Sequence, residues 1–421
     1  MAFRCLLRNN IHMTDLERIL PLWRELESSG ADYVLATVVA VQGPSYRKPG
    51  ARMLLAQDGR RAGTVSGGCL EAEVARRAWW LTSHGPVVER YSTAEDDGDR
   101  PYGSGCGGVV FILLERRETA GPLLAVLEPA FDARTPLAIA TVLDGPRIAL
   151  RAFAGPENLQ PEDPQTLRTF IDCHPERARR VEGPAVRLPI ALPQDQVPES
   201  ADRELQDLAN LALAHRTSME GVLSIDSAPT RAWADYRRAR PGLWVFSAGD
   251  DAKPLVRMAR ELGWFVAVSD GRSHLATPQR FPEADLVRVL PVASSPHGDA
   301  AVSGIKSTDA AVVMAHSFDQ DARVLAALLA LDSRPDYLGV LGTQRRTREL
   351  LTEAAQLLDV AAPEAWLERC IEEIHAPMGL ELGADTPASI ALSILVEIQL
   401  ALTGASGLPL RRVRATKTAR R

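Results

Sequence analysis

The second half of the chain alternates short apolar, β-branched runs with helix-like segments, and this pattern restricts the possible folds more than any other feature. Alternating strands and helices are typical of a doubly wound, mostly parallel sheet, in which ligands bind at the carboxyl ends of the strands. We therefore expect an α/β, Rossmann-like domain over residues 241–405. The predicted strands span residues 243–246, 265–269, 286–290, 311–314 and 337–341.

The end of this domain carries helix signals of its own. Residues 388–402 are strongly apolar, with Thr386 as the expected N-cap and Pro387 at the first helical position, where both residue types are favoured. Residues 406–421 are rich in arginine and lysine and show no apolar periodicity. We expect this basic tail to be disordered.

Residues 1–115 predict a small mixed α/β domain. A capping-box pattern from Thr14 to Glu17 opens a helix, which Pro21 weakens. Residues 116–240 are a middle segment or insertion whose pattern defines no fold. Strands are expected at 33–41, 52–56, 87–91 and 109–115 in the first domain, and strand-like pieces occur at 137–142 and 148–153 in the middle segment.

Composition excludes several classes of function. The net charge of -6 and the pI near 5.8 argue against a polyanion-binding surface, so nucleic acid is not an expected partner. No run approaches the roughly 20 apolar residues of a membrane helix, and the start is too weakly apolar for a signal peptide, so we expect a cytoplasmic protein without membrane contact. Five scattered cysteines fit reduced thiols, and no CxxC or HExxH pattern suggests a zinc site.

Two neighbouring segments of the first domain combine cations with glycines. Residues 45–52 read SYRKPGAR, and residues 66–71 read SGGCLE. Because only a predicted hairpin separates them, we expect them to lie close together in space. Gly67 and Gly68 would leave backbone N–H groups uncovered at a helix N-terminus, which attracts anions such as phosphate.

Cations and two cysteines complete this candidate site. Arg47 and Arg52, together with Lys48, are expected to add charge-assisted contacts to an anion. Cys69 falls in the first turn of the predicted helix, where the helix terminus stabilises a thiolate, and it is the candidate ligand for a metal. Cys106 lies in a glycine-rich turn and is a candidate second thiol. For each cysteine the alternative is a structural thiol beside a tight turn.

The turn after the first predicted strand of the second half has the geometry of a dinucleotide-binding fingerprint. It reads FSAGDDA around Gly249, and Asp270 ends the next predicted strand. Asp270 is placed to hold a ribose hydroxyl and Arg272 to meet a phosphate, which indicates NAD(P). His316 follows a later strand at the same edge and is a candidate for ligand binding or proton transfer, with Asp319 nearby. The alternatives are a capped strand end at Asp270 and a structural histidine at His316.

Two further glycine-containing segments follow. Residues 339–346, GVLGTQRR, end a predicted strand in glycine and arginines, which suits either a phosphate-binding corner or a helix start with solvated arginines. Residues 375–387, HAPMGLELGADTP, lead into the last helix, and their glycines either line a binding site or make plain turns.

Taken together, the segments GPSYRKPGARML, GTVSGGCLE, CGG, GVLGTQRR and PMGLELGADTP resemble the XdhC/CoxI family over about residues 30–115 and 240–402. The resemblance implies an N-terminal XdhC/CoxI domain and a C-terminal Rossmann domain. It also implies a protein that binds the molybdenum cofactor, assists its sulfuration and inserts it into an apo xanthine-dehydrogenase-type molybdoenzyme. A cysteine desulfurase and a second copy of the chain, in a homodimer, are further expected partners. Cys69 matches the family's Gly-Gly-Cys and is the leading cofactor contact.

The chain departs from the family pattern at the Rossmann turn. Ser247 replaces the first glycine, and Asp250 stands where the family more often has a histidine, so both changes weigh against a bound nucleotide. Three hypotheses follow. The chain is an accessory protein and not itself an enzyme, or an NAD(P)-dependent oxidoreductase with His316 as proton donor, or its Rossmann half is only a docking or dimerisation module.

Overall fold

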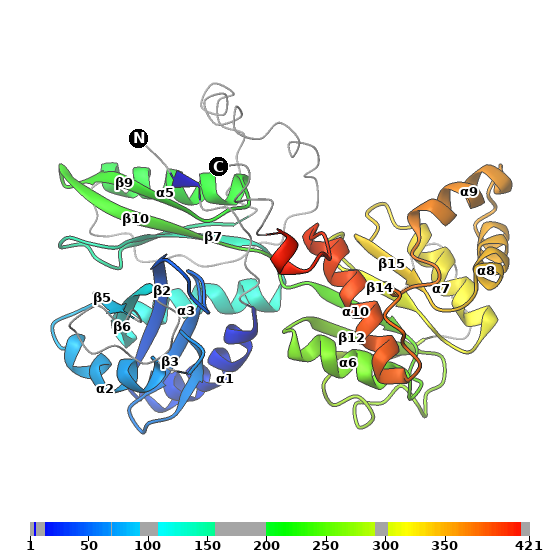
Figure 1. The fold of residues 1–421 in the computed structure, drawn as a ribbon, viewed down its shortest axis with the longest axis horizontal. Helices are drawn as coiled ribbons and strands as arrows, with labels where there is room; N and C mark the ends of the chain where they lie inside the picture. The colour runs from blue at the N-terminus through cyan, green and yellow to red at the C-terminus, as the bar shows by residue number, and fades with distance from the viewer. Residues whose placement is uncertain are drawn as a thin grey trace. The chain divides into compact units, whose positions relative to one another are not determined.

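The computed structural model describes residues 4–5, 13–68, 70–92, 108–155, 199–290 and 302–413. The chain divides into two compact units, Met1–Arg240 and Pro241–Arg421 (Figure 1). Among the helices described, none is long and apolar enough to cross a membrane.

The first sheet of unit 1 is antiparallel and is buried on both faces. Alternate residues of its central strand β2 point to opposite sides: Val34, Ala36 and Val38 pack with α2, whereas Tyr33 and Leu35 pack with α1 and α3. Two buried faces explain why this strand is apolar throughout rather than alternating. The order is β4-β3-β2-β6-β5, formed by β2 (Tyr33–Gln42), β3 (Arg52–Ala56), β4 (Arg61–Gly63), β5 (Val87–Ser92) and β6 (Val109–Arg116), with α1 (Met13–Ser29), α2 (Glu71–Leu81) and α3 (Arg117–Asp132) as covering helices.

Two local expectations for this unit were wrong. Helix α1 begins at Met13, so Thr14 lies inside the helix instead of capping it, and the helix continues through Pro21. Strand β8 begins at Arg151 rather than at residue 148, because residues 146–149 form a turn with Ala149 at φ 69°.

The middle segment and the short strand β1 near residue 5 build a second antiparallel sheet within unit 1. Helix α5 covers one of its faces. Its Trp233 packs with Val39 and Leu113 of the first sheet, so both sheets share a buried cluster. The order is β1-β9-β10-β7-β8, formed by β1 (Arg4–Cys5), β7 (Leu137–Val142), β8 (Arg151–Ala154), β9 (Met219–Ile225) and β10 (Ala228–Arg237), with α5 at Glu199–Ala214.

Unit 2 confirms the predicted doubly wound parallel sheet. All of its strand pairs are parallel, and β11 lies between β12 and β14, so the strand order reverses beside β11. The order is β13-β12-β11-β14-β15, formed by β11 (Gly242–Phe246), β12 (Phe265–Asp270), β13 (Leu286–Val289), β14 (Ala310–Val313) and β15 (Tyr337–Val340).

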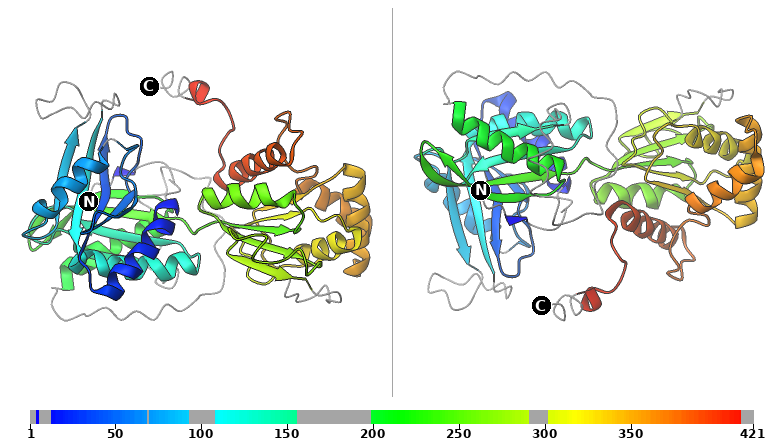
Figure 2. Two further views of the ribbon diagram at one scale, coloured as in Figure 1. Left: turned by 90° about the horizontal axis from the view of Figure 1, so that it is seen from below. Right: turned by 90° about the horizontal axis from the view of Figure 1, so that it is seen from above.

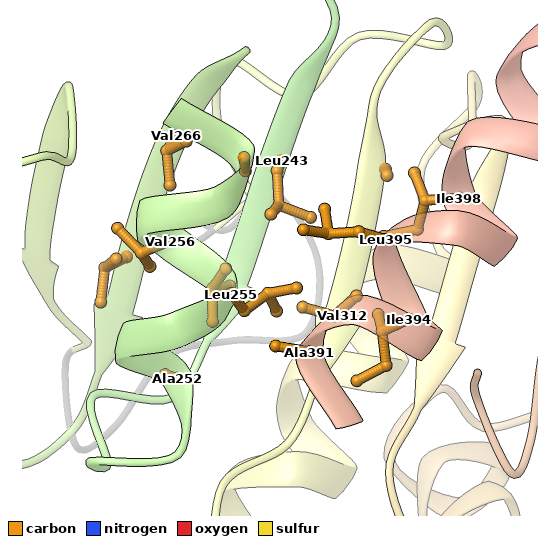
Figure 3. Packing of buried hydrophobic residues seen from close by; sticks show 14 of the residues in the cluster. Leu243, Ala252, Leu255, Val256, Val266, Val312, Ala391, Ile394, Leu395 and Ile398 are labelled. Carbon is orange, nitrogen blue, oxygen red and sulfur yellow. The ribbon is translucent and has the colours of Figure 1, made fainter. Parts of the chain in front are cut away.

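Helices cover both faces of this sheet (Figure 2). On one face, α6 and α10 pack side by side, with Leu255 and Leu395 against Leu243 and Val312 of the strands (Figure 3). The helices are α6 (Ala252–Glu261), α7 (Phe318–Leu329), α8 (Gln344–Leu357), α9 (Pro363–Glu373) and α10 (Pro387–Thr403).

The predicted start of α10 is confirmed. Thr386 is the N-cap, Pro387 follows it, and Ser389 completes a capping box. Of the predicted basic tail, residues 410–413 are helical, and residues 414–421 lie outside the described part of the chain.

Candidate functional site

The loop of residues 43–50 touches both glycine turns of unit 1. A Cβ on Gly67 would lie 3.4 Å from Cγ of the Tyr46 ring, and a Cβ on Gly108 would collide with the carbonyl oxygen of Pro44. The contact between Tyr46 and Gly67 confirms that the two neighbouring segments lie close together. Gly108 therefore needs to be glycine because of this loop, whereas at Gly67 a Cβ would only make van der Waals contact with the ring.

The two candidate cysteines, Cys69 and Cys106, lie outside the described residues. Their neighbours along the chain are placed: Gly68 and Leu70 flank Cys69, and Gly108 follows Cys106 by two residues. Gly67, two residues before Cys69, and Gly108, two residues after Cys106, therefore both contact the 43–50 loop.

The base of the Gly67–Gly68 turn carries its own negative charge. The buried carboxylate of Glu71 accepts hydrogen bonds from the backbone N–H (2.8 Å) and the hydroxyl (2.5 Å) of Ser66. The Ser66 hydroxyl oxygen in turn accepts the N–H groups of Gly68 (3.2 Å) and Leu70 (3.1 Å). Burial raises the pKa of Glu71, but the hydrogen bonds from Ser66 outweigh burial and lower it. The Gly68 N–H is therefore already used within the turn, and Glu71 places a negative charge at the start of α2, beside the expected anion site.

Three cations were expected beside this turn, and one of them is free to meet an anion. Arg47 donates to the carboxylate of Asp15, and Arg52 is buried, donating to Asp235 (3.0 Å) and to the carbonyl of Gly50 (3.2 Å). The expected direct ligand contact of Arg52 is thus corrected to a structural role. Lys48 is exposed, and its side chain has no ion pair within the part of the chain that the structure describes.

The buried pairs of Arg52 belong to a network that joins the two sheets of unit 1. Asp235 on β10 also accepts from Arg237 (3.4 Å), and Arg237 donates to the carbonyl of Gly50 (3.3 Å). Burial and the neighbouring Arg237 lower the pKa of Arg52 to about 10. Burial raises the pKa of Asp15 although Arg47 opposes it. Sequence reasoning missed Asp15 and Asp235, because Asp15 lies within a segment read as a helix start and Asp235 lies in no recognisable motif.

Asp270 lies at the carboxyl edge of the sheet in unit 2, where we expected it to bind a ribose hydroxyl. Its carboxylate already accepts hydrogen bonds from within the protein. Asp270 is fully buried and accepts hydrogen bonds from Ala248 N (2.7 Å) and from Arg272 N (2.8 Å), Nε (3.0 Å) and Nη2 (2.8 Å). Burial raises the pKa of Asp270, but the bonds from Arg272 outweigh burial and lower it. Asp270 and Arg272, expected as two ligand contacts, bind each other instead.

The polar groups of the Rossmann turn also have partners within the protein. The exposed carboxylate of Asp250 accepts from Lys253 (2.7 Å) and Arg280 (2.9 Å), and the Ser247 hydroxyl accepts the N–H of Gly249 (3.1 Å). A Cβ on Gly249 would overlap with the carboxylate of Asp251, so a side chain here would require Asp251 to move. The edge as built does not fit a dinucleotide.

His316 lies on the same edge but with a different partner from the one expected. Its Nε2 is 3.6 Å from Oδ2 of Asp251, and the histidine is 71% exposed. Asp319, the predicted neighbour, pairs with Arg323 instead (3.1 Å). No group of three potential metal ligands occurs among the residues that are placed.

The two arginines that follow β15 have different environments. Thr343 caps α8, and Arg346 donates to the buried carboxylate of Asp321 (2.6 Å), whereas Arg345 stays in solvent. Of the two alternatives, the helix start is the observed one, and Arg346 is held by Asp321 rather than open to a phosphate.

The buried Asp321 makes stability depend on pH. Burial raises its pKa from 3.8 to about 6, although Arg346 and the N–H of Ala315 oppose the shift. A carboxyl group with a higher pKa in the folded chain favours folding below its unfolded pKa, and this contribution is lost as pH rises through the folded pKa. We expect the unfolding free energy of the wild type, relative to Asp321→Asn, to fall by up to about 3 kcal/mol between about pH 4 and about pH 7. Urea titrations at each pH check this, and a difference that is flat with pH would contradict it.

The segment of residues 375–387 is fixed to α10 by a carboxylate that sequence reasoning missed. Glu397 accepts from Tyr337 Oη (2.7 Å) and Gly379 N (2.7 Å), and it lies 3.1 Å from Nδ1 of His375. A Cβ on Gly379 would lie 2.7 Å from the Ser393 hydroxyl. Gly379 therefore serves a tight turn and packing rather than a ligand.

Comparison with known proteins assigns both units. The model of the XdhC and CoxI family matches residues 26–92, and the model of the XdhC Rossmann domain matches residues 243–398. The chain belongs to the XdhC and CoxI family. The first match covers the 43–50 loop and the Cys69 turn, and the second covers the parallel sheet, so the family assignment spans both units.

Three relatives illustrate the family. A Bacillus subtilis protein named as a probable xanthine dehydrogenase subunit is 26% identical over 87% of this chain and 92% of its own length. The "Molybdenum cofactor insertion chaperone PaoD" of Escherichia coli is 35% identical over 30% of this chain and 40% of its own length. A crystal structure described as a xanthine dehydrogenase from Bacillus halodurans has a TM-score of 0.61 at 24% identity and covers 94% of this chain and 97% of its own, which shows the shared fold.

Proposed function

We propose that this XdhC and CoxI family protein is a carrier that binds the molybdenum cofactor and inserts it into a xanthine-dehydrogenase-type molybdoenzyme. The observation that carries the proposal is the 43–50 loop, which contacts Gly67 and Gly108 at the described ends of the two cysteine-bearing turns. Two relatives support it by name, one as a molybdenum cofactor insertion chaperone and one as a probable xanthine dehydrogenase subunit.

The residues around the loop fit the chemistry of such a cargo. Molybdenum bound to sulfur suits thiolate ligands, and the sequence has a cysteine, Cys69 or Cys106, in each of the two glycine turns whose described residues contact the loop. The cargo's phosphate suits Lys48, the exposed cation of the loop. The buried Nε of Arg47 has no hydrogen-bond partner among the described residues, and the pair of Arg47 with Asp15 holds the loop in place. In this proposal Cys69 contacts the metal end, and Lys48 replaces Arg52 as the cation for the phosphate.

The proposal also includes a role in sulfuration and a dimeric assembly. Assistance in sulfuration requires a sulfur donor, and a cysteine desulfurase is the expected partner for that step. A homodimer is the expected assembly. The oxidoreductase alternative has no support from the edge of unit 2, because Asp270 and Asp250 are held by the protein's own cations.

The test is delivery of the cofactor. Protein loaded anaerobically and desalted is mixed with an apo xanthine-dehydrogenase-type enzyme, and the recovered activity is compared with that from free cofactor at the same concentration. We expect faster and fuller recovery from the loaded protein, and a loss of this advantage in Cys69→Ala. Cys370→Ala, which removes a buried thiol of unit 2, is the control. Recovery no better than from free cofactor would overturn the proposal.

A further inference from the structure

Tyr46 is a large aromatic side chain that the protein leaves in solvent. Its side chain is 75% exposed, although it lies at the centre of the 43–50 loop. The ring lies beside Gly67, because its Cγ and Cδ1 are 3.4 and 3.5 Å from the position that a Cβ of Gly67 would take. The rest of the ring is therefore open to a ligand beside the Cys69 turn.

The loop holds this ring in a fixed place. The Ser45 hydroxyl donates to the carbonyl of Arg47 (2.7 Å), and Arg47 is anchored on Asp15. At the end of the loop, Gly50 N donates to the carbonyl of Val38 on β2 (2.8 Å). Both neighbours of Tyr46 are thus tied down, so a ligand that stacks on the ring has little loop motion to restrict.

We propose that the ring of Tyr46 is the stacking platform for the flat pterin ring of the cargo, an inference that rests on the proposed function. Pterin is a fused heteroaromatic system, and such rings stack on exposed aromatic side chains without needing specific hydrogen bonds. The platform lies between the described end of the Cys69 turn and Lys48. The 43–50 loop therefore offers a surface for the ring as well as a cation for the phosphate.

Gly67 brings the Ser66–Gly67–Gly68 turn against this ring. A Cβ at Gly67 would lie 3.4–3.7 Å from the ring carbons, which is van der Waals contact distance. The segment SYRKPG thus contributes the aromatic ring, and the glycine turn of the second segment contributes the backbone against which the ring lies.

The experiment compares wild type, Tyr46→Ala, Tyr46→Phe and Trp80→Ala in the full chain. Trp80 on α2 is the matched control, because its side chain is 71% exposed and it lies outside the loop. The probe is molybdenum cofactor released anaerobically from a molybdoenzyme, and the readouts are its dissociation constant by ultrafiltration and the quenching of pterin fluorescence on binding. Thermal unfolding of each variant confirms that the fold is kept.

We expect about tenfold weaker binding and loss of quenching in Tyr46→Ala, given the size of stacking contributions. Tyr46→Phe and Trp80→Ala should stay within about threefold of wild type and keep the quenching. Binding and quenching by Tyr46→Ala equal to wild type would overturn the inference and leave the carrier intact. Absence of binding by the wild type would overturn the proposed function and the inference together.

Discussion

Replacing Asp235 with alanine is expected to lower the unfolding free energy of the chain by about 3–5 kcal/mol. The reason is that this carboxylate lies between the buried guanidinium groups of Arg52 and Arg237, at 3.0 and 3.4 Å. Its removal would leave two buried positive charges without their shared counter-charge. Urea titration followed by circular dichroism measures the loss.

Asp58→Ala is the matched control for this substitution. Asp58 also pairs with an arginine, Arg60, at 2.7 Å, but both side chains are about half exposed. Exposed pairs contribute about 0–1 kcal/mol because water screens them. If Asp235→Ala cost no more than Asp58→Ala, the buried network would not hold the two sheets together as described.

Gly108→Ala is expected to weaken binding of the molybdenum cofactor by about tenfold or more, because an error of about 1 Å in a binding site is costly. The new Cβ would overlap with the carbonyl oxygen of Pro44 and lie 3.0 Å from its carbonyl carbon. Backbone atoms cannot rotate away as a side chain can, so the 43–50 loop must move. That movement would displace Tyr46 and Lys48 from the Cys69 turn.

The control is Gly155→Ala, because a Cβ on Gly155 would have no neighbour within 4 Å among the residues that the structure describes. Anaerobic ultrafiltration with the cofactor measures both variants, and circular dichroism checks that each one folds. Unchanged binding by Gly108→Ala would show that the position of the loop does not matter for the cargo.

The parallel sheet of unit 2 could be predicted because its signals are local. Each strand is a short apolar run between helix-like segments, and Thr386 and Pro387 mark the start of α10 within two residues. The second sheet of unit 1 could not be predicted in the same way. Its strand β1 pairs with β9 across most of unit 1, and no local pattern reports such a distant partner.

Only the local contacts of the candidate site could be predicted from the sequence. The contact between the 43–50 loop and the Gly67 turn follows from two neighbours along the chain, and the structure confirms it. Arg52 looked like a ligand because its local sequence is a cation near glycines, but its partner Asp235 lies 183 residues away. Asp270 and Arg272 were both recognised, and their pairing with each other needed the geometry of the strand end.

The most direct test of the carrier is the amount of cofactor that stays with the protein. The full chain is incubated anaerobically with molybdenum cofactor and desalted, and molybdenum and pterin are counted per chain for wild type, Cys69→Ala and the Cys370→Ala control. We predict about one equivalent of each on wild type and on Cys370→Ala, and a clear loss on Cys69→Ala. Wild type that retains neither molybdenum nor pterin would contradict the account.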